Sequence, residues 1–249
     1  MRLLPLAATT IALLSVALPR AEALPIEQGD TSIEYRLERL ADLKAFGGPE
    51  IALLEKLNRA DAKHLPRLTQ VVIPITWRTE LEHSPFPAAF PAAQSTPKMI
   101  VVDQPAQAFA AYQNGAQVRW GPISSGRRQK PTPSGLFYLN WRARTRTSTL
   151  SGEWRLNWYF NFHNMRGLAF HEFDLPGVPM SHACVRLLAR DAEWIYQWGE
   201  SWTLDGKGRI QTTGTPVLII GSYDFKAPSP WMTNRAIQVT LPAVLPGPG

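Results

Sequence analysis

The sequence has a single cysteine, Cys184, among its 249 residues. One thiol cannot close an intramolecular disulfide, and it is too few for a zinc site built on cysteines. Charged residues are also sparse, at 18%, whereas hydrophobic residues make up 45%, which excludes a globally disordered chain and supplies a core. The length allows one large domain or two small ones. Whatever chemistry Cys184 performs, it performs as a thiol.

Apolar runs long enough to span a bilayer are lacking outside the N-terminus. Residues 1–23 open with Met1 and Arg2, continue through an apolar stretch to Leu18, and end in Ala21-Glu22-Ala23. This order is typical of a secretory signal peptide. An uncleaved anchor is the alternative, but the run is shorter than the roughly 20 residues that cross a membrane. We expect cleavage after Ala23, export to the periplasm or cell envelope, and no membrane span afterwards.

A mild excess of positive charge is present, with 26 Lys and Arg against 20 Asp and Glu and a net charge of +6. This balance suits nucleic acid, acidic lipid or an acidic wall polymer, and does not choose among them. A basic stretch interleaved with aromatic residues comprises Arg127, Arg128, Lys130, Trp141, Arg142, Arg144, Arg146, Trp154, Arg155, Trp158 and Tyr159. In an exported protein we expect a glycan or an acidic peptide rather than nucleic acid; solvated basic loops over packed aromatics explain the stretch equally well.

Residues 24–78 are expected to form a small helical region. Apolar side chains at helical spacing predict two short helices between Ser32 and Leu57, broken at Gly47-Gly48-Pro49. A strand at Val71 to Ile73 follows and ends at Pro74. The end of this region, Leu57 to Arg59 with Val71 to Pro74, resembles part of a LysM carbohydrate-binding module, although a helical cap packed on the next domain gives the same pattern. Residues 79–97, rich in proline and alanine, are expected to be a linker or a surface wrap.

The rest of the chain has the pattern of a mostly β domain with one principal helix. The predicted strands are Met99 to Val102, Gln107 to Tyr112, Ala116 to Trp120, Leu136 to Trp141 and Pro216 to Gly221. Asn114-Gly115 predicts a tight hairpin turn with positive φ. The helix is predicted from Asp191, as its cap, to Trp202.

The segment from His171 to Leu187 contains the only thiol and two of the five histidines. Cys184 lies between His182 and Arg186, and an adjacent cation lowers the pKa of a thiol and favours the nucleophilic thiolate. A buried structural cysteine is the alternative. A zinc site from Cys184, His171 and His182 lacks paired-ligand spacing, so we expect no metal.

The run from Ser181 to Leu187, SHACVRL, resembles the SHGCxR signature of the L,D-transpeptidase (YkuD-type) catalytic domain family. Further matches occur in the family's order, and together they extend over approximately residues 98–221, followed by a C-terminal extension at 222–249. They are the strand from Met99 with Asp103, Asn114-Gly115, Ser124-Ser125-Gly126, Pro131 to Gly135, His171, and Gly214 to Val217. The resemblance implies a mostly β (α+β) fold with a sandwich or barrel-like catalytic domain. Two departures are Ala183 in place of glycine, which a negative φ would accommodate, and a short gap of 13 residues from His171 to Cys184.

The resemblance also implies catalytic roles. Cys184 would attack a tetrapeptide stem, form a thioester and expel the terminal D-alanine. His171 would accept and donate the protons, His182 would orient or shape the site, and the backbone N–H groups of Ala183 and Cys184 are candidates for an oxyanion hole.

Three residues are candidates for binding the substrate: Arg186, Ser181 and Trp158. Arg186 would pair with a substrate carboxylate, with a structural salt bridge as the alternative. His163 and Asn164 could border the cleft and receive no catalytic role.

The implied function is L,D-transpeptidation on peptidoglycan stem peptides, without cofactor, by an enzyme that carbapenems acylate. Hydrolysis or D-amino-acid exchange would use the same Cys184 and His171. A wall-binding protein without catalysis is the third reading, which the combination of a thiol with two histidines argues against. The sequence does not predict the acyl acceptor or the oligomeric state.

Overall fold

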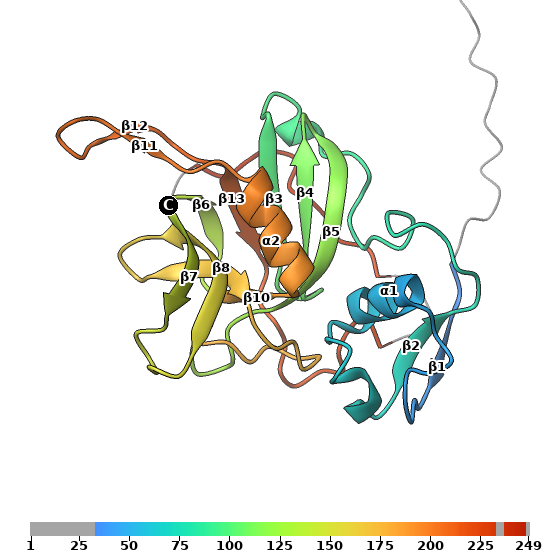
Figure 1. The fold of residues 1–249 in the computed structure, drawn as a ribbon. Helices are drawn as coiled ribbons and strands as arrows, with labels where there is room; N and C mark the ends of the chain where they lie inside the picture. Colours follow the sequence, from blue (N-terminus) through green and yellow to red (C-terminus); the bar gives the residue numbers. More distant parts are fainter. Residues whose placement is uncertain (1–32, 233–236, 248–249) are drawn as a thin grey trace, which may run out of the picture. The chain divides into compact units, whose positions relative to one another are not determined.

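A curled sheet of nine strands forms the centre of the computed structural model, which describes residues 33–232 and 237–247 (Figure 1). The expected signal peptide and its cleavage site lie outside these residues. The strand order is β6-β13-β3-β4-β5-β10-β9-β8-β7, with β13 parallel to β3 and β10 parallel to β9. The strands are β3 (Lys98–Asp103), β4 (Ala108–Gln113), β5 (Ala116–Ser124), β6 (Gly135–Tyr138), β7 (Arg142–Thr147), β8 (Arg155–His163), β9 (Leu168–Glu172), β10 (Val185–Leu187) and β13 (Pro216–Ile220). The prediction of a mostly β fold is confirmed.

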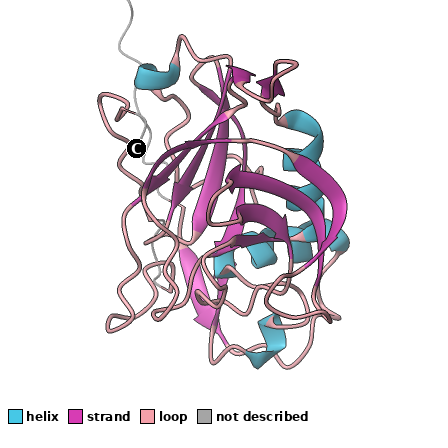
Figure 2. Ribbon diagram, turned by 90° about the vertical axis from the view of Figure 1, so that its left-hand side faces the viewer, coloured by secondary structure: helices cyan, strands magenta, loops and turns pink. Residues whose placement is uncertain are grey.

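Five of the nine strands of the sheet, β3, β4, β5, β6 and β13, carry the apolar, β-branched or alternating pattern from which they were predicted. All residues of β3 after Lys98 are buried, and β4 and β5 are joined at Asn114 and Gly115, whose φ values of 50° and 76° match the predicted hairpin turn. Figure 2 shows how the sheet curls, with the helices outside it. The basic strand β7, the aromatic β8 and the short strands β9 and β10 were not predicted as strands. Arg144 and Arg146 of β7 lie over the rings of Trp158 and Trp141, so the basic stretch covers packed aromatics.

The principal helix is α2 (Ala189–Trp198), which packs against β8 and β9. The prediction began it at Asp191 as a cap, and this was wrong, because the N-cap is Leu188 and Asp191 lies in the first turn. The Asp191 side chain is instead fully buried and accepts hydrogen bonds of 2.7 and 2.9 Å from Arg119 of β5. The helix also ends before the predicted Trp202, at Trp198, with Gly199 as its C-cap.

The N-terminal region contains one helix where two were predicted. Strand β1 (Tyr35–Glu38) occupies the place of the first, and pairs antiparallel with β2 (Val71–Pro74). Between them lie α1 (Gly48–Asn58) and the short helix η1 (Leu65–Arg67). The helical spacing of Ile33, Leu37 and Leu40 led to a wrong prediction, because these residues belong to a strand and the loops that flank it. Within the strand, only Tyr35 is buried. We call residues 33–78 the cap.

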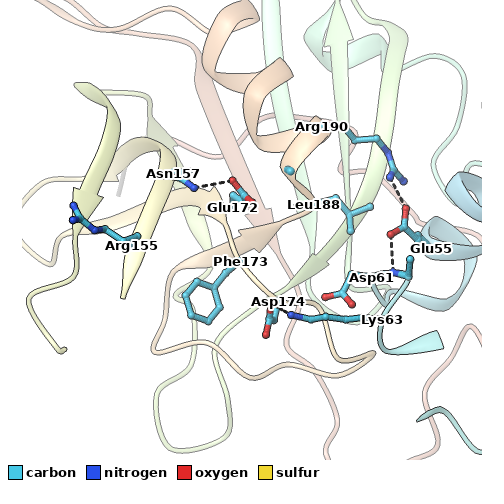
Figure 3. A pocket seen from close by; sticks show the side chains of 12 residues that line it. Glu55, Asp61, Lys63, Arg155, Asn157, Glu172, Phe173, Asp174, Leu188 and Arg190 are labelled. Atoms are coloured by element: carbon cyan, nitrogen blue, oxygen red, sulfur yellow. Dashed lines mark hydrogen bonds and ion pairs between the residues drawn. The ribbon is translucent and has the colours of Figure 1, made fainter. Parts of the chain in front are cut away.

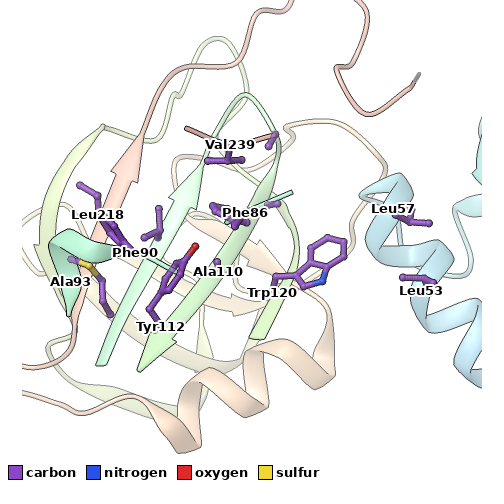
Figure 4. Close-up of a cluster of buried hydrophobic side chains, with 14 of the residues drawn as sticks. Leu53, Leu57, Phe86, Phe90, Ala93, Ala110, Tyr112, Trp120, Leu218 and Val239 are labelled. Atoms are coloured by element: carbon purple, nitrogen blue, oxygen red, sulfur yellow. The ribbon is translucent and has the colours of Figure 1, made fainter. Parts of the chain in front are cut away.

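Segment 79–97 wraps over the sheet and contains the short helix η2 (Pro91–Ala93). Phe86 and Phe90 of this segment are buried in one core cluster together with Leu57 of α1 and Trp120 of β5 (Figure 4). The C-terminal extension joins the same cluster through Val239, whose N–H donates to the Pro85 carbonyl at 2.7 Å. The remaining strands, β11 (Thr203–Leu204) and β12 (Ile210–Thr212), form an exposed hairpin.

Candidate active site

Strands β9 and β10 bring the two principal candidates together. His171 lies on β9, and its register partner on the parallel strand β10 is Arg186, two residues after Cys184. Cys184 therefore precedes β10 directly and lies beside β9, with Sγ 3.9 Å from the carbonyl oxygen of Gly167. His171 and Cys184 are separated by a short segment of sequence, and the parallel pairing of β9 and β10 brings them close together.

The loop before Cys184 is anchored by Ser181. Its N–H donates to the Ser125 carbonyl and its own carbonyl accepts from the Arg127 N–H, each at 3.0 Å. Its hydroxyl donates to the Cys184 carbonyl, and the residue is 2% exposed. The Ser181 hydroxyl is therefore engaged within the loop and helps to position Cys184; binding of substrate by Ser181, which also lines the cavity described below, stays a prediction.

Ala183 has a φ of 83°, in the left-handed region that favours glycine. The sequence reasoning accepted alanine on the condition of a negative φ, and that condition is not met. The loop nevertheless holds this conformation, because the Thr132 hydroxyl donates to the Ala183 carbonyl at 3.0 Å and the side chain is buried. Strain of order 1 kcal/mol is therefore stored next to the thiol.

His171 is neutral at pH 7. Burial, assisted by the positive charge of Arg186, lowers the pKa of His171 to about 4. Nδ1 lies 2.9 Å from the Glu172 carbonyl, which can only accept, so Nδ1 carries the hydrogen and Nε2 keeps its lone pair. This is the tautomer of a proton acceptor.

The Cys184 thiol is half-buried and also neutral. Burial raises its pKa, and the N–H of Ala169 and the charge of Arg186 oppose this rise without reversing it. The expectation of a lowered thiol pKa was wrong, because desolvation of the thiolate outweighs the neighbouring cation. The resting site thus holds a thiol beside a neutral imidazole, rather than a preformed thiolate.

His182 and Arg186 reach the same pocket. The His182 ring lies 5.4 Å from the ring of Trp154, and its buried Nδ1 has no partner among the described residues. Arg186 lies 4.5 Å above the ring of Phe173 and donates to the Asp174 carbonyl at 3.3 Å. Within residues 33–232 and 237–247 it forms no salt bridge, so the structural alternative for Arg186 finds no partner.

A small cavity of about 50 Å³ lies over the thiol. Leu150 and Trp154, from the loop between β7 and β8, form one side of it. Trp158 does not line this cavity, and its ring packs 5.3 Å from Tyr196 of α2; its contact with substrate stays a prediction. The residues lining the cavity are Ser148, Leu150, Trp154, Leu156, His171, Phe173, Ser181, His182, Cys184 and Arg186. Sequence reasoning missed Trp154 and Phe173 as site residues, because the aromatic pattern does not say which rings face the thiol.

Residues 97–219 match the family model described as the YkuD, L,D-transpeptidase catalytic domain. This segment is a YkuD domain. It contains the thiol, both candidate histidines and the nine-stranded sheet described above.

Solved structures similar to this chain include L,D-transpeptidases. The enzyme from Stackebrandtia nassauensis is 21% identical with a TM-score of 0.42, and the match covers 51% of this chain and 57% of that one. The enzyme from Mycobacterium smegmatis is 19% identical with a TM-score of 0.41, covering 50% and 59%. L,D-transpeptidase 1 of Mycobacterium tuberculosis is 22% identical with a TM-score of 0.38, covering 50% and 62%. This chain thus spans less than two thirds of each, and no curated protein matches it.

Two further kinds of feature are absent from the described residues. No helix among them is long and apolar enough to cross a membrane. No group of three or more His, Cys, Asp or Glu side chains in the same residues is arranged to hold a metal ion.

Proposed function

We propose that this protein is an exported L,D-transpeptidase that remodels peptidoglycan through a thioester on Cys184. The observation that carries the proposal is the neutral His171 beside the Cys184 thiol, over one small cavity within a YkuD domain. A binding protein needs neither a thiol nor a buried imidazole with a free Nε2.

In the acylation step, Cys184 attacks the carbonyl that precedes the terminal D-alanine of a tetrapeptide stem. As the S–C bond forms, the thiol proton passes to Nε2 of His171; this transfer compensates for the raised pKa of the thiol. The C–N bond then breaks, and His171 returns the proton to the leaving amine. The Glu172 carbonyl holds the ring throughout.

The negative oxygen formed during attack would be stabilised by backbone N–H groups. Across the described residues, the N–H groups of Ala183 and Cys184 donate to no protein acceptor, so both are free to bind an oxyanion. The left-handed φ of Ala183 sets the direction of this peptide segment, which gives the stored strain a use.

Arg186 is the group proposed to bind a substrate carboxylate. Its guanidinium has a ring below it and a single backbone acceptor, which leaves donors for a bidentate pair. His182, on the opposite side of Cys184 in the sequence, is proposed to shape the pocket rather than to move protons.

The test of the thioester uses a carbapenem, whose strained lactam carbonyl is an electrophile for a thiol. Intact-protein mass after incubation should increase by one drug molecule, and peptide mapping should place the adduct on Cys184. Cys184→Ala should remain folded and form no adduct, and the rate for the wild type should fall below about pH 4, where His171 takes up a proton. An adduct on another residue, or none on folded protein, would refute the mechanism.

The reaction class is tested with a purified disaccharide-tetrapeptide. Dimers indicate transfer, which we propose; tripeptides indicate hydrolysis by the same residues, and unchanged substrate indicates a binding protein. Export is tested separately, since protein recovered from the envelope should begin at Leu24.

A second candidate function for the cap is glycan binding. The antiparallel β1–β2 pair with two helical segments between them supplies the first strand that the LysM resemblance lacked. Loss of binding to insoluble peptidoglycan after replacing exposed cap residues, with acylation of Cys184 unchanged, would support it.

A further inference from the structure

A groove of about 260 Å³ lies between β6, the end of β8 and the base of the β11–β12 hairpin. We call it the aromatic groove; it is lined by residues 136–138, Asn140, residues 162–165, Trp202, Ile210 and Thr213. In the part of the chain that the structure describes, none of the lining residues is Asp, Glu, Lys or Arg. Because an unpaired charge is costly to remove from water, such a lining suits a ligand that carries no charge.

A larger cleft, of about 610 Å³, differs from the aromatic groove in its charge (Figure 3). Its lining includes Arg155, Glu172 and the ion pair between Lys63 and Asp174. The cavity over the thiol is charged as well, through Arg186. The aromatic groove therefore differs from both in the class of ligand that it favours.

Aromatic rings supply much of the apolar surface of the groove. The centroid of the Phe137 ring lies 5.7 Å from that of Phe162 and 5.6 Å from that of His163, so its position is fixed by packing. Phe137, Tyr138 and Trp202 are half-buried, and each keeps part of its ring open to solvent. A flat, fixed ring with an open face is a surface on which the apolar face of a sugar ring can stack.

Three polar groups of the groove have hydrogens to donate. The Trp202 indole N–H, the Tyr138 hydroxyl and the Asn164 amide nitrogen donate to no acceptor among the described residues. The oxygen of the Asn164 amide is already used, because it accepts from the Trp141 indole at 2.9 Å. An apolar peptide or a second copy of the chain would bury these donors without acceptors, which is unfavourable. The hydroxyl and acetamido oxygens of a sugar would satisfy them.

The turn between β8 and β9 joins the aromatic groove to the thiol. Asn164 and Met165 of this turn line the groove, and the carbonyl oxygen of Gly167, at its other end, lies 3.9 Å from Sγ of Cys184. The Gly167 N–H donates to the Asn164 carbonyl at 3.2 Å, and the ends of such a turn lie within about 7 Å. The groove thus begins roughly 10 Å from the thiol, which is the length of about three extended residues.

We propose that the aromatic groove binds one N-acetylhexosamine unit of the glycan strand that bears the stem peptide. Trp202 stacks on the sugar ring, and Tyr138 and Asn164 donate to its acetamido and hydroxyl oxygens. The groove is smaller than the roughly 300 Å³ at which pockets for larger ligands begin, so it takes one ring. The choice of this strand rests on the proposed function, in which three residues of the stem precede the bond that Cys184 attacks.

Binding is tested on the full chain with chitotriose, a neutral trimer of N-acetylglucosamine that has no bond for the thiol to attack. Trp202→Ala should weaken its affinity, measured by calorimetry, about tenfold, and Tyr138→Phe, which removes one oxygen and preserves the packing, about threefold. Trp194→Ala, a matched change on α2 outside the groove, should leave the affinity as in the wild type. Cellotriose, which lacks acetamido groups, should bind at least about tenfold more weakly than chitotriose.

The link to catalysis is tested by comparing two substrates, a disaccharide-tetrapeptide and the free tetrapeptide. Trp202→Ala should raise the ratio of the first Michaelis constant to the second about tenfold, because only the first substrate carries the sugar. Trp194→Ala should preserve the ratio of the wild type.

Wild-type affinity for chitotriose in both Trp202→Ala and Tyr138→Phe would overturn the proposal, and so would equal affinity for the two trimers. Loss of binding in Trp77→Ala on the cap, with Trp202→Ala unaffected, would place the glycan on the cap and overturn it as well. An equal rise in both Michaelis constants would show that Trp202 acts through the fold around the thiol. Chitotriose binding that depends on Trp202, in a wild type that forms no carbapenem adduct, would refute the proposed function and leave the glycan site standing.

Discussion

His171 makes stability depend on pH at the scale of a single residue. Its pKa is about 4 in the folded chain and about 6.5 in an unfolded one. Between these values the unfolded state binds a proton that the folded state does not, so the free energy of unfolding falls as the pH falls through this window. The loss from pH 7 to pH 4.5 should be about 2 kcal/mol.

Urea unfolding of His171→Gln at the two pH values measures this contribution. The variant should lose about 2 kcal/mol less than the wild type between them. His163→Gln, at a half-exposed histidine of β8, should keep the wild-type difference. Identical pH profiles for the wild type and His171→Gln would contradict the neutral, buried imidazole.

Ala183 provides a second prediction at this scale. Replacing it with glycine removes a methyl group and adds chain entropy, but it also relieves the strain of the left-handed φ. These terms offset one another, so Ala183→Gly should change the free energy of unfolding by less than about 1 kcal/mol.

The control is Ala169, equally buried on β9 but with a negative φ. Ala169→Gly gains no relief of strain and should cost about 2 kcal/mol in the same denaturation experiment. Equal losses for both variants would show that Ala183 is not strained.

At the scale of elements, α2 is fixed to β5 by a buried charge pair. Asp191 is fully buried, and Arg119 is 23% exposed and donates two hydrogen bonds to it. Arg119→Met leaves the carboxylate without its cation and should lower the free energy of unfolding by about 3 kcal/mol. Arg209→Met removes the exposed pair with Asp205 in the β11–β12 hairpin and should lower the free energy of unfolding far less than Arg119→Met does, because water screens an exposed pair. Chemical denaturation of both variants tests this prediction. Similar losses of unfolding free energy in the two variants would contradict the role of Arg119 as the partner of a buried carboxylate.

Elements were predictable from sequence where local pattern and burial agree. The strands β3, β4 and β13 are continuously apolar or alternate, and the Asn114-Gly115 turn has its own backbone requirement. Strand β1 was mistaken for a helix, since it has one buried residue and is held by pairing with the distant β2. Strand β7 was missed because its alternate arginines lie over aromatic rings rather than in a core.

In the candidate site, too, some features could be predicted from the sequence and others could not. The residues of the SHACVRL run and His171 could be found by motif, but the conformation of Ala183 and the direction of the Cys184 pKa shift depend on long-range burial. The partners of Ser181 depend on how the segment after β5 packs on the loop before Cys184. The presence of Trp154, and not Trp158, in the lining of the thiol cavity depends on how β7 and β8 pair. Sequence spacing contains no information on these contacts.

At the scale of the whole molecule, the cap, segment 79–97, the sheet and the C-terminal extension share one core cluster. Leu57 of α1 belongs to it, so Leu57→Ala should destabilise the cap and sheet together, by about 2–5 kcal/mol. Calorimetry should show one transition, shifted as a unit. Leu204→Ala, on a residue 45% exposed in the β11–β12 hairpin, should leave the transition in place. Two transitions, only one of them moved by Leu57→Ala, would contradict a shared core.

The C-terminal extension constrains when this chain can fold during its synthesis. Trp231 lies 5.4 Å from the guanidinium of the buried Arg59, and Val239 binds the backbone at Pro85. The first and last parts of the described chain thus complete one another, and a nascent chain still held on the ribosome has an open apolar surface on its cap and on segment 79–97. A premature stop codon before residue 231 would therefore leave every earlier element intact in sequence, and yet yield a protein prone to aggregation.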